Sequence, residues 1–435
     1  MKQYLTYKKS GLVNVETIPA HWEALKLRLV CDQIFTGNTP VYAYEPNEYL
    51  VFGQRNNQKN CIDLTGIKYA DPEFYAARTE SEFLRYGDVL LNTLGGGSVG
   101  RIGFYDVKDK QVITDGHVMI LRGNKSVEQK YLYYFLHSQQ PFIEETAVGS
   151  TNQAFLTTIQ MFQWKVAVPP LAEQQAIAQY LDSKTAKIDE SISLYEQQKA
   201  DLVEYRKALI SDTVTRGLNP NASLKDSGIQ WLGQIPEGWR VLKCGLLFST
   251  IGSGTTPKSD NLAYYSEVGQ PWLQTGDLND GYITRTNKFV SELALNDYSL
   301  PIYPKGSIVI AMYGATIGKL GILDIETCTN QACCVLANGN GIENKFAFYV
   351  LAAGKKELIN SANGGGQPNI SQAIIRDFRV PVPSLAEQQQ IVAFLEAKTA
   401  MIDEAICRID EQITDLRNYR TALITDAVTG KIDVR

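Results

Sequence analysis

The residues best suited to chemistry are glycines spaced as in a dinucleotide-binding turn. Gly95-Gly-Gly-Ser-Val-Gly100 fits the pattern G-x-G-x-x-G and follows a strand-like apolar run. In a nucleotide-binding turn, the N-terminus of the next helix binds the pyrophosphate. Here the next residues, Arg101-Ile-Gly-Phe-Tyr105, have the pattern of a second strand. The sequence therefore favours a glycine-rich turn between strands, and a nucleotide-dependent enzyme remains as an alternative.

A second loop is similar to a phosphate-binding loop. In Gly252-Ser-Gly-Thr-Thr-Pro-Lys-Ser259 no glycine precedes Lys258, and Pro257 removes a backbone donor that would bind phosphate. Thr255, Thr256 and Lys258 could still contact a DNA backbone. A solvent-exposed polar loop is the other interpretation.

Two amide-rich loops occupy matching places in the chain. Gly149-Ser-Thr-Asn-Gln153 and Gly364-Gly-Gly-Gln-Pro-Asn369 each precede a Val-Pro segment and a long helix. The amides of Asn and Gln pair well with base edges, whereas ordinary turns use the same residue types. The contact candidates from these loops are Asn152, Gln153, Gln367 and Asn369.

The composition indicates a globular protein without a catalytic or metal site. Among 435 residues, 44% are hydrophobic and 20% are charged, and no apolar run is long enough for a membrane span. Three histidines and no C-x-x-C pair leave no zinc site, and we find no catalytic constellation. Seven cysteines without paired spacing indicate a reducing compartment. We therefore expect a soluble, cytoplasmic protein.

The net charge of −5 lies in two segments. Residues 171–216 carry six basic and eight acidic side chains, and residues 385–435 carry six and nine. The rest of the chain is balanced and could hold local basic patches.

Those acidic segments are one stretch that occurs twice. Leu171-Ala-Glu-Gln-Gln175 and Leu385-Ala-Glu-Gln-Gln389 lie 214 residues apart, and each opens a helix of about 45 residues, roughly 65 Å long. A heptad stripe predicts that the helices pair. Its main positions are Leu181, Ile188, Ile192, Leu202 and Leu209 in the first copy, and Leu395, Ile402, Ile406, Leu416 and Leu423 in the second.

Polar residues interrupt the stripe at the same places in both copies. Thr185 matches Thr399, and Arg206 matches Arg420. They could set the register of the pair. For the arginines we favour the alternative that they reach water at a widened end of the stripe.

The globular blocks repeat together with the helices. Ile18-Pro-Ala-His-Trp22 returns as Ile235-Pro-Glu-Gly-Trp239, and Gly37 returns as Gly254. Short β-branched runs broken by Gly and Pro predict mixed α/β blocks, so the fold class is α+β. We predict a first block at 1–165, a helix at 166–217, a linker and second block at 218–379, and a C-terminal helix at 380–435. Two-fold symmetry would make the helices antiparallel, with the blocks at opposite ends.

These motifs, in this order, resemble the specificity subunits of type I restriction–modification systems. The resemblance rests on the two Leu-Ala-Glu-Gln-Gln helices, their Tyr205-Arg and Tyr419-Arg endings, Met312-Tyr-Gly-Ala-Thr316, Asn330-Gln-Ala332 and the C-terminal Thr429–Arg435. It spans the whole chain. The first block departs from the pattern, with Asn92–Ser98 and Asp115-Gly-His117 at the corresponding places.

The resemblance implies a non-catalytic subunit that reads bipartite double-stranded DNA. Each block would be a target-recognition domain, and the helices an antiparallel coiled coil that sets the gap between half-sites. Two methyltransferase subunits would use S-adenosylmethionine for adenine-N6 methylation. Two motor–nuclease subunits would use ATP and Mg. No cofactor is expected on this chain, and no membrane is involved.

The expected DNA contacts lie in the divergent stretches and the polar loops. The candidates are Gln54, Arg55, Asn57, Lys59, Asn92, Ser98 and Arg101 in the first block, and Gln274, Thr275, Asp277, Tyr313 and Lys319 in the second, together with the loop residues above. A two-fold protein-binding adaptor without DNA specificity is the alternative function, because the charge of the blocks is balanced.

Overall fold

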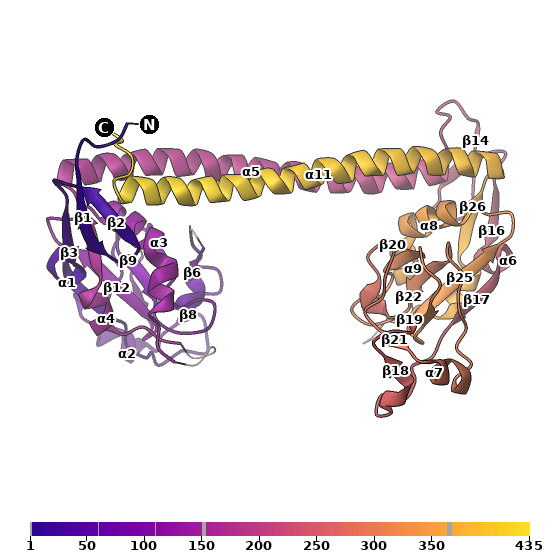
Figure 1. Ribbon diagram of the computed structural model, residues 1–435, viewed down its shortest axis with the longest axis horizontal. Coiled ribbons are helices and arrows are strands. Elements are labelled where there is room, and N and C mark those ends of the chain that lie inside the picture. The colour runs from indigo at the N-terminus through magenta and orange to yellow at the C-terminus, as the bar shows by residue number, and fades with distance from the viewer. Residues whose placement is uncertain (1, 60, 109, 150–153, 363–367) are drawn as a thin grey trace. The chain divides into compact units, whose positions relative to one another are not determined.

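The computed structural model describes residues 2–59, 61–108, 110–149, 154–362 and 368–435 (Figure 1). The chain divides into two compact units. The first unit comprises residues 1–195 and 411–435, and the second comprises residues 196–410. Each unit is described by itself. Both long helices, α5 (Leu171–Arg216) and α11 (Leu385–Val428), contribute to both units.

The first unit is built on a four-stranded sheet in the order β10-β9-β12-β4 and a three-stranded sheet in the order β11-β5-β8. Its elements are β1 (Tyr7–Leu12), β2 (Val15–Pro19), β3 (Glu23–Lys26), α1 (Leu27–Val30), β4 (Cys31–Thr36), β5 (Leu50–Phe52), η1 (Gln54–Asn56), β6 (Asn57–Gln58), β7 (Cys61–Ile62), β8 (Lys68–Tyr69), α2 (Pro72–Ala76), η2 (Glu80–Glu82), β9 (Val89–Asn92), β10 (Ile102–Phe104), β11 (Val112–Thr114), β12 (Val118–Gly123), α3 (Gln129–Glu145), α4 (Thr158–Gln163) and β13 (Lys165–Val168).

The second unit repeats this plan, with a sheet in the order β17-β25-β22-β23-β20 and another in the order β18-β21-β19-β24. Its elements are β14 (Leu224–Asp226), β15 (Gln234–Pro236), β16 (Arg240–Lys243), α6 (Cys244–Leu247), β17 (Phe248–Ser253), η3 (Leu262–Tyr264), β18 (Tyr265–Ser266), β19 (Gln270–Leu273), η4 (Thr275–Asp277), β20 (Gly281–Ile283), β21 (Phe289–Val290), α7 (Glu292–Asp297), β22 (Ile308–Ala311), β23 (Leu320–Leu323), β24 (Cys328–Thr329), β25 (Cys333–Gly339), α8 (Asn344–Ala353), α9 (Lys355–Asn360), α10 (Gln372–Asp377) and β26 (Arg379–Val382).

Each unit closes its core with the beginning of one long helix and the end of the other. In the first unit, Ile177 and Leu181 of α5 share a core with Ile424 and Val428 of α11. In the second unit, Ile391 of α11 shares a core with Ile210 and Val214 of α5. Burial of apolar side chains from both helices against the sheet domain is the main force that holds each unit together.

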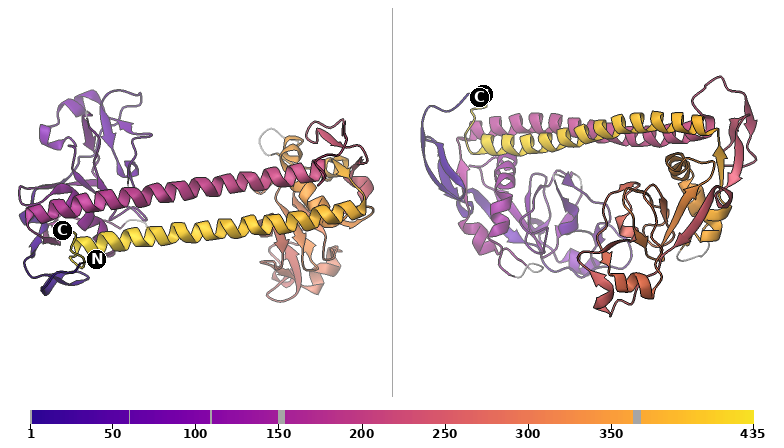
Figure 2. Two further views of the ribbon diagram at one scale, coloured as in Figure 1. Left: turned by 90° about the horizontal axis from the view of Figure 1, so that it is seen from above. Right: turned by 45° about the vertical axis from the view of Figure 1, so that its right-hand side comes forward.

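The long helices lie side by side and antiparallel in both units (Figures 1 and 2). Asp189 pairs with Arg420 in the first unit, and Arg206 pairs with Asp403 in the second. The pairing confirms the prediction from the heptad stripe, and its antiparallel direction confirms the prediction from two-fold symmetry.

All ten predicted seam residues are buried or half-buried, whereas the first residue of each helix is not. Leu171 and Leu385 are 43% and 51% exposed, so the heptad stripe does not extend to the helix starts. There the buried face turns to the sheet domain instead, through Gln174 and Gln388, which are fully buried.

The arginines on the stripe differ from the prediction. Arg420 Nε lies 2.9 Å from Asp189 Oδ1, and Arg206 Nε lies 2.9 Å from Asp403 Oδ1. The expectation that these arginines reach water is therefore wrong. Each one forms an ion pair with an aspartate of the other helix. Among the described residues, no helix combines the length and the apolar composition that a membrane span needs.

Candidate nucleic-acid interface

Loops that follow strands of both sheets of the first unit meet at one edge of the domain. Gln54 Nε2 donates to Leu94 O at 2.7 Å and to His117 O at 3.3 Å, which joins the loops after β5, β9 and β11. Gly37, after β4, is so close to Thr114 that an added Cβ would lie 2.1 Å from the Thr114 carbonyl oxygen. We call this edge the first loop edge.

The second unit has the same frame of backbone hydrogen bonds at its own loop edge. Asp115 N donates to Phe52 O at 3.0 Å, and at the equivalent place Asn330 N donates to Leu273 O at 3.1 Å. An added Cβ on Gly254 would lie 1.7 Å from the carbonyl oxygen of Thr329, which repeats the close approach at Gly37.

A second backbone bond supports the same alignment. Thr93 N donates to His117 O at 2.9 Å, and Met312 N donates to Ala332 O at 2.8 Å. The two edges therefore hold different side chains on one frame. His117 and Gln331 are exposed there, although neither was among the predicted contacts.

The divergent stretches turn out to be structural equivalents. Each follows a strand that pairs in parallel with its neighbour, β5 with β11 and β19 with β24. Each then forms a short 3-10 turn closed by a side chain. Gly53 N donates to Asn56 Oδ1 at 3.0 Å, and Gln274 N donates to Asp277 Oδ2 at 2.8 Å. The sequence analysis missed this match because the residue types differ.

Two predicted contacts of the first unit are fully buried. Asn57 Nδ2 donates to Asn92 Oδ1 at 3.0 Å and to Arg101 O at 3.2 Å. A side chain without exposed surface cannot reach a base edge. The expectation that Asn57 and Asn92 contact DNA is therefore wrong. These buried side chains stabilise the loops instead.

The glycine-rich turn joins two strands. Gly95, Gly97 and Gly100 have positive φ values of 96°, 83° and 82°, and β10 follows rather than a helix. No helix N-terminus is therefore present there to bind a pyrophosphate. Arg101 donates from its guanidinium to Asn57 O and Gly97 O at 3.0 and 3.1 Å, and Ser98 Oγ donates to Leu94 O at 3.1 Å.

The other predicted contacts lie at the two edges with varying exposure. Arg55, Lys59, Thr255, Lys258 and Asn369 are exposed, and Gln54, Ser98, Arg101, Thr256, Gln274, Thr275, Asp277, Tyr313 and Lys319 are half-buried. Thr256 Oγ1 donates to Gln331, and Tyr313 forms a backbone bridge with Asn369. Asn152, Gln153 and Gln367 lie outside the described residues.

Burial also affects an acidic group at the first edge. It raises the pKa of the Asp115 carboxyl, while the N–H of His117 acts in the opposite direction. Asp115 Oδ1 accepts that N–H at 2.9 Å, so the carboxylate orders the loop that carries His117.

The Leu-Ala-Glu-Gln-Gln motif anchors each sheet domain to its helix. Trp22 Nε1 donates to Glu173 Oε1 at 3.0 Å, and Trp239 Nε1 donates to Glu387 Oε2 at 3.1 Å. The sequence motif alone did not predict these contacts.

The glutamine that follows each glutamate accepts a hydrogen bond from the N-cap residue of a helix in the sheet domain, α3 or α8. Glu128 N donates to Gln174 Oε1 at 2.8 Å, and Glu343 N donates to Gln388 Oε1 at 2.7 Å. The repeated motif is therefore a polar joint between helix and domain.

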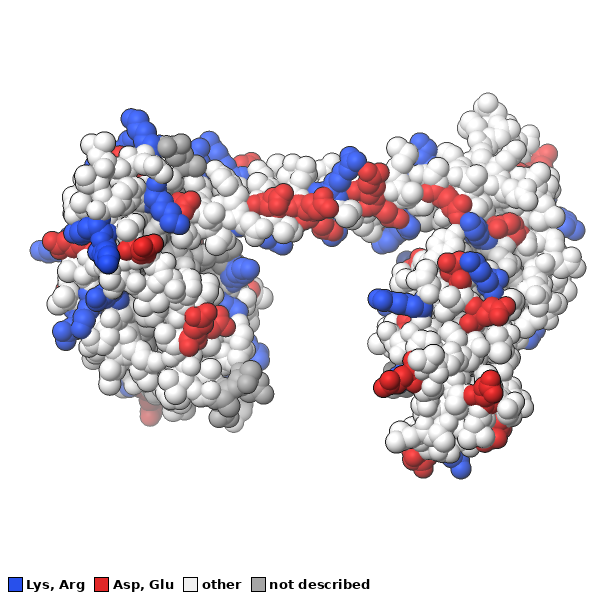
Figure 3. Space-filling view, viewed as in Figure 1, with Lys and Arg blue, Asp and Glu red and all other residues white. Residues whose placement is uncertain are grey.

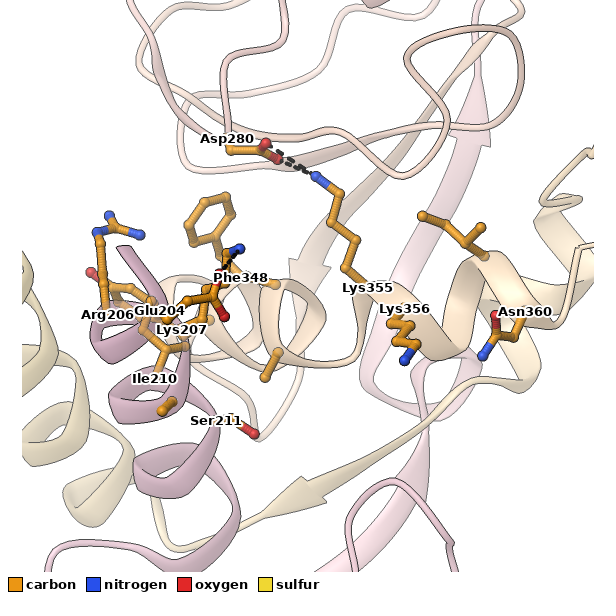
Figure 4. A pocket seen from close by; sticks show the side chains of 15 residues that line it. Glu204, Arg206, Lys207, Ile210, Ser211, Asp280, Phe348, Lys355, Lys356 and Asn360 are labelled. Carbon is orange, nitrogen blue, oxygen red and sulfur yellow. Dashed lines mark hydrogen bonds and ion pairs between the residues drawn. The ribbon is translucent and has the colours of Figure 1, made fainter. Parts of the chain in front are cut away.

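A groove of about 760 Å³ lies in the second unit between α5 and the helices α8 and α9 (Figure 4). Phe348, Ala352 and Ile359 make it largely apolar, and Lys355 and Lys356 lie along it. Exposed acidic side chains on the long helices include Glu190, Asp201 and Glu404. Figure 3 shows acidic and basic side chains interspersed along these helices.

Comparisons with known proteins agree with this architecture. The family model described as "Type I restriction modification DNA specificity domain" matches residues 19–201 and 236–414. The putative type I restriction enzyme MjaX specificity subunit of Methanocaldococcus jannaschii is 25% identical, over 99% of this chain and 98% of its own. The MjaVIII specificity subunit of the same organism is 27% identical, over 75% of each chain.

Solved structures share the fold. A chain from a study of "complex assembly and conformational transition of the type I R-M system" has a TM-score of 0.75 and 17% identity, with 95% of this chain and 99% of that chain covered. The HsdS subunit of Thermoanaerobacter tengcongensis has a TM-score of 0.54 and 17% identity, with 95% and 98% covered. The family model occurs twice and covers most of the sequence, so the chain belongs to the family of type I restriction modification DNA specificity domains.

Proposed function

We propose that this chain is the DNA-recognition subunit of a type I restriction–modification enzyme. The observation that carries the proposal is one backbone frame that presents different side chains at two loop edges. Gln54 and His117 stand in the first unit where Thr275 and Ala332 stand in the second. A reader of two unlike half-sites needs a constant frame with variable side chains, because sequence is read by contacts to base edges.

The contacts to DNA divide by chemistry. Arg55, Lys59, Arg101, Lys258 and Lys319 would neutralise phosphates. Amide, hydroxyl, carboxylate and imidazole groups would read bases, from Gln54, Ser98 and His117 in the first unit, and from Gln274, Thr275, Asp277, Gln331 and Asn369 in the second. Thr255 and Thr256 would contact the DNA backbone. Tyr313 offers a ring and a hydroxyl beside Asn369.

The chain itself would be non-catalytic and would direct partner subunits. We propose that two methyltransferase subunits dock on the long helices and two motor–nuclease subunits complete the assembly. Exposed carboxylates on α5 and α11 repel phosphate and suit a basic protein surface instead. S-adenosylmethionine, ATP and Mg would then be used by the partners. The seven cysteines form no disulfide among the described residues and five of them are buried, which fits a cytoplasmic location.

The test is DNA binding by the complex of this chain with its methyltransferase partner. We expect sequence-selective binding whose affinity falls steeply with salt, by about 10³-fold or more between 50 and 200 mM if six or more phosphates are contacted. Fluorescence anisotropy on duplexes with and without the methylated site measures both properties. Binding that ignores salt and sequence would contradict the proposal and favour a protein adaptor.

A further inference from the structure

A small polar cavity of about 200 Å³ lies in the first unit beside the glycine-rich turn. Lys59 and Arg101 line it from the loops of the first edge, and His137, Gln140 and Glu144 line it from α3. Small-molecule sites usually measure about 300–1,000 Å³, so this cavity suits a single phosphate group rather than a nucleotide.

The charge of the lining favours an anion. Arg101 is held by Asn57 O and Gly97 O, and these bonds use two of the five N–H donors of a guanidinium. Lys59 adds a second positive charge and Glu144 one negative charge, so the lining keeps a net positive charge. Burial, and then the charges of Arg420 and Lys59, lower the pKa of His137 to about 4, so its ring is neutral at pH 7.

The second unit carries an internal ion pair at the equivalent place, beside the groove between α5, α8 and α9. Gly318 matches Gly100, since both have positive φ and an added Cβ would meet the following helix, at Ile359 and at Glu144 respectively. If the 3-10 turns are aligned so that Gly53 matches Gln274, Lys59 corresponds to Asp280. If Glu128, before α3, is aligned with Glu343, before α8, Gln140 corresponds to Lys355.

A shared backbone donor supports this alignment. Ile102 N donates to Gln140 Oε1 at 3.3 Å, and its equivalent Leu320 N donates to Asp280 Oδ1 at 2.9 Å. Asp280 then binds Lys355 Nζ at 3.0 Å, and Figure 4 shows the Lys355 side chain extended toward it. In the second unit, the Asp280 carboxylate therefore already occupies this donor and the Lys355 ammonium.

We propose that the cavity of the first unit is a phosphate site that seats one phosphodiester of the bound DNA, and that the second unit lacks it. The inference rests on the proposed function, because the loops that carry Lys59 and Arg101 also form the first loop edge. The inference goes beyond that function because it predicts that the two domains bind the DNA backbone unequally.

The deciding variant transplants the ion pair of the second unit into the first unit. Lys59→Asp combined with Gln140→Lys recreates the ion pair that the second unit already carries, so the fold has a precedent for it. Arg28→Ala, at an exposed position of α1, is the matched control. In the complex with the methyltransferase, we expect the double variant to bind DNA on the order of tenfold more weakly, with a salt slope smaller by about one phosphate contact. Arg28→Ala should leave both unchanged.

A second arm follows histidine NMR signals of the free chain during titration with inorganic phosphate. The chain has three histidines, so His137 can be assigned by substitution, while His117 reports the loop edge and His21 the distant Glu173 anchor. A shift of His137 that is lost in the double variant shows that the site takes free phosphate as well as DNA.

The outcomes separate the two proposals. If the double variant weakens DNA binding but inorganic phosphate does not shift the His137 signal, the site is confirmed as one for backbone phosphate. If only inorganic phosphate responds, the DNA assignment is overturned and a small phosphate-bearing ligand replaces it. If neither responds while wild-type DNA binding is intact, the inference fails and the proposed function stands. If the wild-type complex binds no DNA, the proposed function fails and the phosphate titration alone decides the site.

Discussion

Arg420 of α11 forms a two-pronged ion pair with Asp189 of α5, at 2.9 Å from Nε and 3.2 Å from the second terminal nitrogen. Arg206 and Asp403 repeat the pair with the helices exchanged. The repeat therefore includes the contacts between the helices, and each unit has its own copy of the register-setting pair.

The two copies should differ in their contribution to stability. The Arg420 side chain is 10% exposed and that of Arg206 is 33% exposed. Because the aspartates remain half-exposed, we expect Arg420→Ala to lower the free energy of unfolding by about 1–2 kcal/mol and Arg206→Ala by less than about 1 kcal/mol. Urea denaturation measures both. Lys207→Ala, in an exposed pair with Glu204, is the control, and an equal loss there would contradict the prediction.

The glutamate anchors give a second prediction. Tyr4, His21 and Trp22 all contact the buried Glu173 carboxylate, whereas Glu387 receives the indole of Trp239. We expect Glu173→Ala to cost about 2–4 kcal/mol, because it leaves a buried indole N–H without its acceptor, and Glu387→Ala to cost about half as much.

Thermal unfolding measures the effect of these anchor variants. Glu190→Ala, at an exposed position of the same helix, is the matched control. A Glu173→Ala protein as stable as the Glu190→Ala protein would show that the carboxylate is not an anchor.

His137 gives the stability of the first unit a pH dependence. Burial and nearby positive charges lower its folded pKa to about 4, while the unfolded value is near 6.5. The unfolded chain thus binds more protons in this window, and stability falls as the pH falls below 6.5. We expect His137 to account for about 2 kcal/mol of the loss between pH 7 and pH 5.

The measurement compares urea denaturation of wild type and His137→Ala at both pH values. Alanine is the residue of the second unit at this position, Ala352. Identical losses in the two proteins would rule out the assigned role of His137.

The long helices should set the distance between the half-sites. One heptad inserted in each helix, after Tyr195 and after Asp410, leaves the contacts inside both units intact. Each insertion adds about 10 Å, which is roughly three base pairs at 3.4 Å each. Methylome sequencing should then reveal a gap about three base pairs longer between unchanged half-sites. An unchanged gap would show that the helices do not set the distance between the half-sites.

The long helices and the repeat could be predicted from the sequence because their signal is local and periodic. An unbroken run without Gly or Pro defines α5, and its observed bounds, Leu171–Arg216, agree with that run. The turn at Gly95–Gly100 could be placed between strands because Ile102 and Phe104 follow it with β spacing.

The polar joints and the loop edges could not be predicted, because they depend on contacts between distant residues. Glu173 and Trp22 are 151 residues apart, and neither has a pattern that names the other. The equivalence of Gln54–Asn56 with Thr275–Asp277 is carried by backbone hydrogen bonds rather than by residue type. Asn57 looked like a base-reading amide because burial cannot be read from a polar stretch.

Exchange of one sheet domain tests the central claim most directly. Residues 1–165 are replaced by those of a relative with a different target, and the methylated sequence is mapped in cells that also carry the methyltransferase partner. The account predicts a new first half-site with the second half-site and the gap unchanged. An unchanged target, or a change in both halves, would contradict the claim that each domain reads its own half of the DNA.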